Sequence, residues 1–298
     1  MENTRKFPLI LSSFWLKVIA LFTMTLDHIG YNLQGYSNPD WLPTFAHVLR
    51  VIGRIALPLF CFMIAEGAIK TKSFGKYSLR LGIMASIISV GMIGAEYIPS
   101  IPSLRSLGII FIDLLLGAVA IYCLRQKKWY FKALAALPLM YGIASFVASF
   151  LESCGCHGKI LWFPFFLRTQ YGWYAIAMCI LFYVANLLAK LFISYLSEQT
   201  GVKEENYAGT NFERNAINII SAFMVIACTL AYYFVVKAIP NQYVNNLDME
   251  TQLYAMVAGA FILLYSGRRG YNKKWFQYGS YLYYPIHLAV IYLIFEII

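Results

Sequence analysis

The sequence has few charged side chains, and even fewer acidic ones. Only 13% of its 298 residues are Asp, Glu, Lys or Arg, and 60% are hydrophobic, whereas a soluble domain carries roughly 25% charged residues. No polar stretch is long enough to form a soluble domain. The alternating pattern of a transmembrane β-barrel is missing, and so is the internal repeat found in many secondary transporters. These absences favour an all-α, polytopic membrane protein and weaken the case for a transporter.

Long apolar runs are present instead. A helix needs about 20 apolar residues to cross the hydrocarbon core, and the chain predicts about nine such helices, with eight or ten left open, in a single membrane domain over residues 1–298. The predicted spans are 14–33, 47–69, 81–98, 107–124, 131–150, 172–196, 215–239, 250–266 and 276–296. We expect no cleavable signal peptide, because the first apolar run is too long and lacks a small-residue cleavage site.

The net charge of +10 comes from Lys and Arg gathered in short loops between the spans. The basic loops follow the second, fourth and eighth predicted spans, at 70–80, 125–132 and 267–275. The positive-inside rule places these loops and the N-terminus in the cytoplasm. Membrane topology therefore accounts for the charge without a nucleic-acid partner, and we expect a multi-pass protein of the inner, or cytoplasmic, membrane in contact with lipid.

The six cysteines give little sign of a metal site. Four of them fall within predicted spans, where cysteine usually serves as a packing residue. Cys154, Cys156 and His157 lie close together in a loop, but structural zinc needs four ligands and typically wider cysteine spacing. We predict no metal, and a disulfide or redox role of this loop is left open.

Two acid–base residues, Asp27 and His28, lie side by side in the first predicted span. Ionisable groups in a membrane helix usually face a protein or water-lined interior and mark chemistry or transport. Lys17 lies eleven residues earlier, which puts it on the same helix face as His28 and about 16 Å away along the axis. The spacing indicates a helix with a cation near its cytoplasmic end and a candidate general base deeper in.

The second predicted span carries two arginines one turn apart, Arg50 and Arg54. Gly53 between them permits close approach of another helix. The guanidinium fork suits a carboxylate or a phosphate. The pair therefore predicts either a site for an anionic ligand or ion pairs with Asp27 and Asp113, and the two interpretations are compatible.

Two further residues in the same span affect its shape and chemistry. Pro58 removes a backbone hydrogen bond and is expected to kink the helix. Glu66 lies three turns beyond Arg54, but about 120° around the helix from it, so the two need not meet.

Cations also follow this span, and a histidine occupies the last one. Lys70, Lys72, Lys76 and Arg80 form a basic rim, which is either a topology signal or a landing site for a phosphorylated cofactor. His287 follows a proline in the last predicted span. It either forms a hydrogen bond to a neighbour or lines the same cavity as His28.

Several ordered motifs resemble the TraX family, membrane proteins associated with N-terminal acetylation of conjugative pilin. The motifs that carry the resemblance are LKVIALFTMTLDHIG (16–30), LRVIGRIALPLFCFMIAEG (49–67), KYSLRL (76–81), YGWYAIAMCILFY (171–183), YSGRRG (265–270) and YLYYPIHL (281–288). More distantly, the first span resembles the acyltransferase-three family of membrane enzymes, in which an arginine, ten intervening residues and a histidine recur. Here Lys17 stands at the arginine position and His28 at the histidine position.

The resemblance implies acyl transfer from acetyl-CoA, the acyl-CoA donor on the cytosolic side, to an amine or hydroxyl of an acceptor protein, such as pilin, or of a glycan. His28 matches the position of the catalytic histidine, and the other matched motif positions are Asp27, Arg50, Arg54, Glu66, Arg80 and His287. Histidine suits proton abstraction at neutral pH, so His28 is the predicted base, acting directly or through an acyl-histidine. The coenzyme phosphates are expected to contact Lys17, Lys72, Lys76 and Arg80.

Two other interpretations of the ionisable residues stay open. A small-anion transporter would use Arg50 and Arg54 as its binding pair and would not depend on acyl-CoA. A non-catalytic assembly protein would keep the ion pairs for packing alone. The acceptor, the acyl chain and the oligomeric state, including a homodimer, are not decided by the sequence.

Overall fold

The computed structural model describes residues 9–95, 97, 108–154, 162–239 and 249–297. It is all-helical: 79% of it is helix, and its described part holds no strand, only an isolated bridge between Leu11 and Tyr265. The longer helices are α1 (Ser13–Leu33), α2 (Leu42–Gly53), α3 (Ala56–Lys70), α4 (Phe74–Ala95), α5 (Ile110–Leu124), α7 (Ala136–Ser153), α8 (Trp173–Thr200), α9 (Asn211–Lys237) and α12 (Lys274–Ile297). The shorter ones are α6 (Trp129–Leu134), α10 (Met249–Leu253) and α11 (Ala258–Leu263), besides short 3-10 turns. The all-α prediction is confirmed.

The chain divides into two compact units. The first comprises Met1–Phe60, Val184–Tyr233 and Asp248–Ile298, and the second comprises Cys61–Tyr183 and Phe234–Leu247. Helices α3, α8 and α9 each begin in one unit and end in the other. Each unit is described below by itself.

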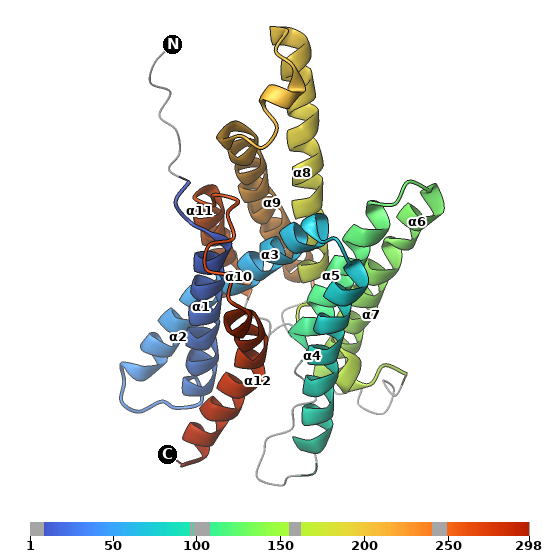
Figure 1. Ribbon diagram of the computed structural model, residues 1–298. Helices are drawn as coiled ribbons and strands as arrows, with labels where there is room; N and C mark the ends of the chain where they lie inside the picture. Colours follow the sequence, from blue (N-terminus) through green and yellow to red (C-terminus); the bar gives the residue numbers. More distant parts are fainter. Residues whose placement is uncertain (1–8, 96, 98–107, 155–161, 240–248, 298) are drawn as a thin grey trace. The chain divides into compact units, whose positions relative to one another are not determined.

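In the first unit, α1 lies against both α2 and α12 (Figure 1). Helices α1 and α12 run parallel, because Lys17 lies over the ring of Phe276 and His28 contacts His287. These two contacts are eleven residues apart on both helices. Lys17 and His28 therefore share the face of α1 that meets α12, as their spacing predicts.

A loop between α11 and α12 fixes the start of α1. The backbone N–H of Leu11 donates to the carbonyl of Leu264, that of Ser266 donates back to Leu11, and that of Ser13 donates to Arg268. This loop includes the YSGRRG motif, and its glycines Gly267 and Gly270 adopt positive φ, a conformation that costs other residues free energy. The motif thus ties the start of α1 to the loop that leads into α12.

Close contact of α1 and α2 depends on two glycines. A Cβ on Gly53 would lie 2.3 Å from the Cβ of Asp27, and one on Gly30 would lie 2.8 Å from the carbonyl oxygen of Ala46. Neither distance leaves room for a methyl group, so the prediction that Gly53 permits close helix approach is confirmed.

The second predicted span is broken as its proline predicts. Helix α2 ends at Gly53, a turn covers residues 54 and 55, and α3 begins at Ala56. Pro58 has no N–H to donate to the carbonyl of Arg54, so the hydrogen-bond ladder cannot continue through this turn.

In the second unit, α5 packs between α4 and α7 (Figure 1). Phe62 of α3 meets Phe182 of α8 edge to face, with ring centroids 5.3 Å apart. A Cβ on Gly117 of α5 would lie 2.7 Å from the sulfur of Cys179. The small residue Gly117 therefore lets α5 and α8 approach closely, as in membrane helix packing generally. The ring pair packs α3 against α8.

Five helical segments of the described chain are long and apolar enough to cross a membrane, fewer than the nine predicted. They are Leu42–Lys70, Phe74–Gly94, Trp129–Glu152, Trp173–Thr200 and Asn211–Lys237. The segments Ile110–Leu124 and Glu250–Leu263 are apolar but shorter. Helices α1 and α12 are long, yet they fall outside the five, and α1 is the helix that carries Lys17, Asp27 and His28. Apolar runs in the sequence therefore overestimated the number of long, uniformly apolar helices.

Candidate functional site

Two histidines meet between α1 and α12. Nδ1 of His28 lies 2.8 Å from Nε2 of His287, and the ring centroids are 5.0 Å apart. His287 is buried and His28 is partly buried. Of the two alternatives left open for His287, the structure thus shows the first, a hydrogen bond to a neighbour, and that neighbour is His28.

The hydrogen-bond partners assign the tautomers of the neutral pair. Nδ1 of His287 lies 2.8 Å from the backbone carbonyl of Tyr283, which can only accept, so this nitrogen carries the proton. Nε2 of His287 is then the acceptor, and Nδ1 of His28 donates to it. Nε2 of His28 keeps a lone pair, and no hydrogen bond from the described residues reaches it. This nitrogen is therefore available as a proton acceptor.

Aromatic rings hold the histidine pair in place. The ring of Tyr283 stacks on His287 at a centroid distance of 5.0 Å. The ring of Tyr284 is roughly perpendicular to both imidazoles, with centroids 5.5 Å from His287 and 6.2 Å from His28. The Tyr283 hydroxyl also contacts the Thr25 hydroxyl at 2.6 Å. The YLYYPIHL motif thus supplies both the second histidine and the side chains that orient it.

Beside the histidines, one carboxylate is shared by two arginines. Oδ1 of Asp27 accepts a hydrogen bond from Nη1 of Arg50 at 3.0 Å, and a second from Nη2 of Arg54. Nη1 of Arg54 donates to Oε1 of Gln252 at 3.3 Å. Asp27, Arg54 and Gln252 are all buried. The predicted ion pairs of Asp27 are confirmed, and Gln252, on α10, is a member of the site that sequence inspection missed.

Two guanidinium groups meet the carboxylate that precedes His28 in the sequence, in a poorly solvated place. Arg50 also lies over the ring of Tyr31, at 5.3 Å from its centroid. The cluster can stabilise negative charge that develops near His28.

Two further acidic residues considered in the sequence, Glu66 and Asp113, belong to the second unit. Glu66 is buried in the second unit and forms an ion pair with Lys70, one turn further along α3. Asp113 accepts hydrogen bonds from the backbone N–H groups of Gln170 at 2.7 Å and Tyr171 at 3.2 Å. Asp113 thus has a structural role in holding the segment before α8.

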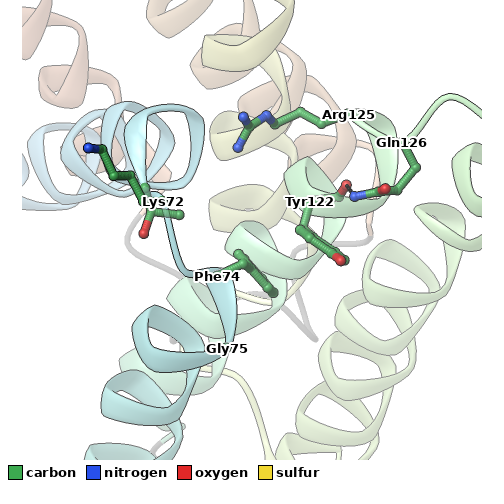
Figure 2. A pocket seen from close by; sticks show the side chains of 7 residues that line it. Lys72, Phe74, Gly75, Tyr122, Arg125 and Gln126 are labelled. Atoms are coloured by element: carbon green, nitrogen blue, oxygen red, sulfur yellow. Dashed lines mark hydrogen bonds between the residues drawn. The ribbon is translucent and has the colours of Figure 1, made fainter.

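The four predicted cofactor-binding cations are divided between the two units. Lys17 belongs to the first unit, and its ammonium lies 5.7 Å from the ring centroid of Phe276. Lys72 lines a pocket in the second unit, shown in Figure 2. Lys76 and Arg80 are exposed on α4, outside the set of residues that lines this pocket. Arg125 does line it, and sequence inspection had treated it only as part of a basic loop.

The cysteine loop is only partly covered by the structure. Cys154 ends α7, whereas Cys156 and His157 lie outside the described residues. Within the described part of the chain, no group of three or more His, Cys, Asp or Glu side chains is placed to hold a metal ion.

The fold and the site together define a helical protein with membrane-like spans and a buried histidine–carboxylate–arginine cluster. Comparison with known families is specific about the class. The TraX protein family model matches residues 12–198, well over half of the chain and including α1, α2 and α3. The chain belongs to the TraX family. The more distant resemblance to the acyltransferase-three family finds no support.

Two curated proteins are similar to parts of the chain. The probable fimbrial assembly protein FimC, serogroup H1, of Dichelobacter nodosus is 38% identical over 92 residues, which are 30% of this chain and 36% of that protein. The uncharacterized protein RP591 of Rickettsia prowazekii (strain Madrid E) is 28% identical over 174 residues, 57% of this chain and 54% of that protein. The matches thus cover about a third and about half of these relatives. No solved structure matches the chain.

Proposed function

We propose that this protein is an integral membrane acyltransferase that moves the acetyl group of acetyl-CoA to an amine or hydroxyl of an acceptor, with His28 as the base. The observation that carries the proposal is the His28–His287 hydrogen bond, which leaves the Nε2 lone pair of His28 available. Membership of the TraX family supports it, because the resemblance to that family implies acetylation.

In the proposed reaction, His28 carries the proton from the acceptor to the coenzyme. Nε2 of His28 takes a proton from the acceptor amine or hydroxyl while the acceptor attacks the thioester carbonyl. The C–N or C–O bond forms, the carbonyl becomes an oxyanion, and the C–S bond then breaks. The histidinium returns its proton to the coenzyme thiolate, so His28 is regenerated. In the alternative, Nε2 of His28 itself attacks the thioester carbonyl, so that a C–Nε2 bond forms, the C–S bond breaks and the coenzyme leaves as its thiolate. The acceptor then attacks the acyl-histidine, the C–Nε2 bond breaks, and the proton of the acceptor ends on the coenzyme thiolate.

The neighbours of His28 have distinct roles in this mechanism. His287 accepts the Nδ1–H of His28 and steadies the imidazolium that forms when His28 gains a proton. Arg50 and Arg54 supply guanidinium groups that favour the oxyanion, and Asp27 fixes their positions. Glu66 is also proposed as a site residue, because it occupies a position of the family motif.

The donor and acceptor are proposed from chemistry and family. We assign the coenzyme phosphates to the cations Lys17, Lys72, Lys76 and Arg80. The acceptor is a protein N-terminus or a glycan hydroxyl at the membrane, and pilin is the first protein to test, since one relative is named a fimbrial assembly protein. A homodimer is compatible with this scheme.

We further place the protein in the inner membrane with a cytoplasmic N-terminus. Because α1 and α12 run parallel, they start on the same side if both cross the membrane, which requires an odd total number of spans. Nine spans satisfy this condition, whereas eight and ten do not.

The anion-transporter interpretation has less support. Both arginines already share the carboxylate of Asp27, which lowers their combined charge and occupies two of their donors. A transporter would move an anion into liposomes without covalent change and without acetyl-CoA.

The proposal is tested by following label from acetyl-labelled acetyl-CoA onto a pilin-like peptide with a free N-terminus and onto a sugar hydroxyl. We expect wild type to transfer label to one of them and His28→Ala to transfer none. His47→Ala is the matched control, because His47 is exposed on α2 and is expected to leave transfer unchanged. Equal transfer by wild type and His28→Ala would remove His28 from the mechanism.

A further inference from the structure

A pocket of about 500 Å³ lies in the second unit, where α3, α4 and α5 end or begin (Figure 2). Its lining residues are Thr71, Lys72, Phe74, Gly75, Tyr122, Arg125 and Gln126. Thr71 and Lys72 belong to the link between α3 and α4, Phe74 and Gly75 begin α4, and the other three lie at the end of α5. The pocket therefore belongs to one unit and involves none of the histidine cluster.

The walls of the pocket combine positive charge with a flat aromatic surface. Figure 2 shows Arg125 on the side of Tyr122, and Lys72 on the other side of Phe74 with its ammonium directed away from Arg125, so a long, flexible side chain must turn for both cations to reach one ligand. The rings of Phe74 and Tyr122 are stacked, with centroids 4.2 Å apart and planes inclined by 14°. A pocket lined by stacked aromatic rings and two cationic residues suits a ligand that has an anionic head and a less polar body.

Arg125 is positioned by the protein. Its Nη1 donates to the backbone carbonyl of Ala68 at 2.5 Å, which ties the end of α5 to α3. Nε and Nη2 form no hydrogen bond within the described part of the chain, so the guanidinium is held in place with donors left over. A guanidinium with two donors to spare is suited to bidentate contact with phosphate oxygens.

No acidic side chain offsets this charge nearby in the sequence. Residues 67–95 and 114–151 contain no Asp or Glu, and the carboxylate of Glu66 is paired with Lys70. The cations on these segments are Lys70, Lys72, Lys76, Arg80, Arg125, Lys127, Lys128 and Lys132. The positive-inside rule accounts for basic loops, but it requires neither an anchored guanidinium nor a stacked aromatic wall.

We propose that this pocket binds a phosphate ester, whose phosphate group contacts Lys72 and Arg125 and whose body lies along Phe74 and Tyr122. Two sources carry this chemistry: the head group of an anionic phospholipid, and a soluble nucleotide. Basic pockets between membrane helices on the cytoplasmic side are suited to lipid head groups. Lys72 is also one of the cations assigned above to the coenzyme phosphates, so binding of a nucleotide here rests on and deepens the proposed function, whereas binding of a lipid head group is independent of it. Phosphate binding by the pocket does not itself require acyl transfer, so its failure and the failure of the transfer assay are distinguishable.

The experiment uses the full chain in nanodiscs and two probes. In the first arm, native mass spectrometry counts the phosphatidylglycerol retained by protein released from nanodiscs of phosphatidylcholine and phosphatidylglycerol. In the second arm, calorimetry measures ADP binding in nanodiscs of phosphatidylcholine alone. Four proteins are compared: wild type, Lys72→Gln, the double variant Lys72→Gln/Arg125→Gln, and Lys128→Gln as the matched control. Lys128 is an exposed cation near α5 that does not line the pocket.

We expect wild type to bind at least one probe and the double variant to bind it about tenfold more weakly or worse, since two charged contacts are lost. Lys128→Gln is expected to stay within about twofold of wild type. Retention of lipid identifies a head-group site, and binding of ADP identifies a nucleotide site. Lys72→Gln leaves the Arg125–Ala68 bond intact, so a weaker affinity in this single variant cannot be attributed to misfolding around that bond. Binding of neither probe by wild type, or equal affinity of the double variant and Lys128→Gln, would overturn the proposal.

Discussion

Replacing His287 by leucine is expected to lower kcat for acetyl transfer by about 10- to 150-fold, because a hydrogen bond to a charged group contributes about 1.5–3 kcal/mol and each 1.36 kcal/mol is a tenfold change in rate. The magnitude follows from the 2.8 Å contact between His28 Nδ1 and His287 Nε2. In the ground state this bond fixes the tautomer of His28. During proton abstraction it also stabilises the new imidazolium, so its loss is felt more strongly in the transition state.

The matched variant is His287→Gln. The amide oxygen of glutamine can accept the Nδ1–H of His28, so we expect less than about a tenfold loss of kcat for this variant. Donor release is followed as free coenzyme thiol over a range of acetyl-CoA concentrations, which separates kcat from KM. His287 is a positioning residue in this account, and KM for acetyl-CoA is expected to change little. If the leucine variant has the kcat of wild type, or if the glutamine variant is no better than the leucine variant, the tautomer argument is refuted.

Three further predictions concern stability and donor binding. Asp27→Asn removes the carboxylate that pairs with the buried Arg54 and the partly buried Arg50. It is expected to lower the free energy of unfolding by about 3–5 kcal/mol in denaturation experiments in detergent. Asp40→Asn, in an exposed turn, should have no measurable effect, and equal stability of the two variants would contradict the ion-pair assignment. Gly53→Ala forces a methyl group to within 2.3 Å of Asp27. It is expected to lower the melting temperature, at a cost in stability of about 1–3 kcal/mol. Gly279→Ala, where nothing lies within 4 Å, should not lower the melting temperature, and a Gly53→Ala variant as stable as wild type would show that α1 and α2 are not packed so closely. Arg80→Ala is expected to raise KM for the acyl donor more than it lowers kcat, and an unchanged KM would count against a basic rim for the coenzyme phosphates.

Much of the site could be predicted because ionisable residues are rare in this chain. Asp27, His28, Arg50 and Arg54 stand out in apolar surroundings. Helical periodicity placed the two arginines on one face, and the carboxylate pairs with both of them. Burial leaves few other partners for a charge, so residue type alone is informative here.

Other parts of the site depend on contacts between distant segments, which periodicity does not reveal. Gln252 reaches Arg54 from α10, and its amide is an ordinary residue type with no charge to draw attention to it. Arg125 looks like any cation of a basic loop until its contact with Ala68 is seen. Tyr283 and His287 are one helical turn apart, a spacing at which the histidine can donate to the tyrosine carbonyl and so fix its tautomer. This tautomer matters for the site only because His287 contacts His28, and the sequence does not reveal that contact.

The number of long apolar helices was the weakest prediction. Apolar composition along a segment does not decide where a helix starts and stops, and the 250–266 span is divided between α10, a 3-10 turn and α11. The ionisable residues that mark the site also make α1 less apolar than the five segments that qualify as spans.

The most direct test of the central claim is acetyl-CoA binding and hydrolysis by the purified protein in detergent, with His28→Ala and free coenzyme A for comparison. The account predicts saturable acetyl-CoA binding by both proteins and slow hydrolysis by wild type only, because the base at Nε2 is lost while the donor site is kept. Hydrolysis at equal rates by both proteins, or no binding of acetyl-CoA by wild type, would contradict it.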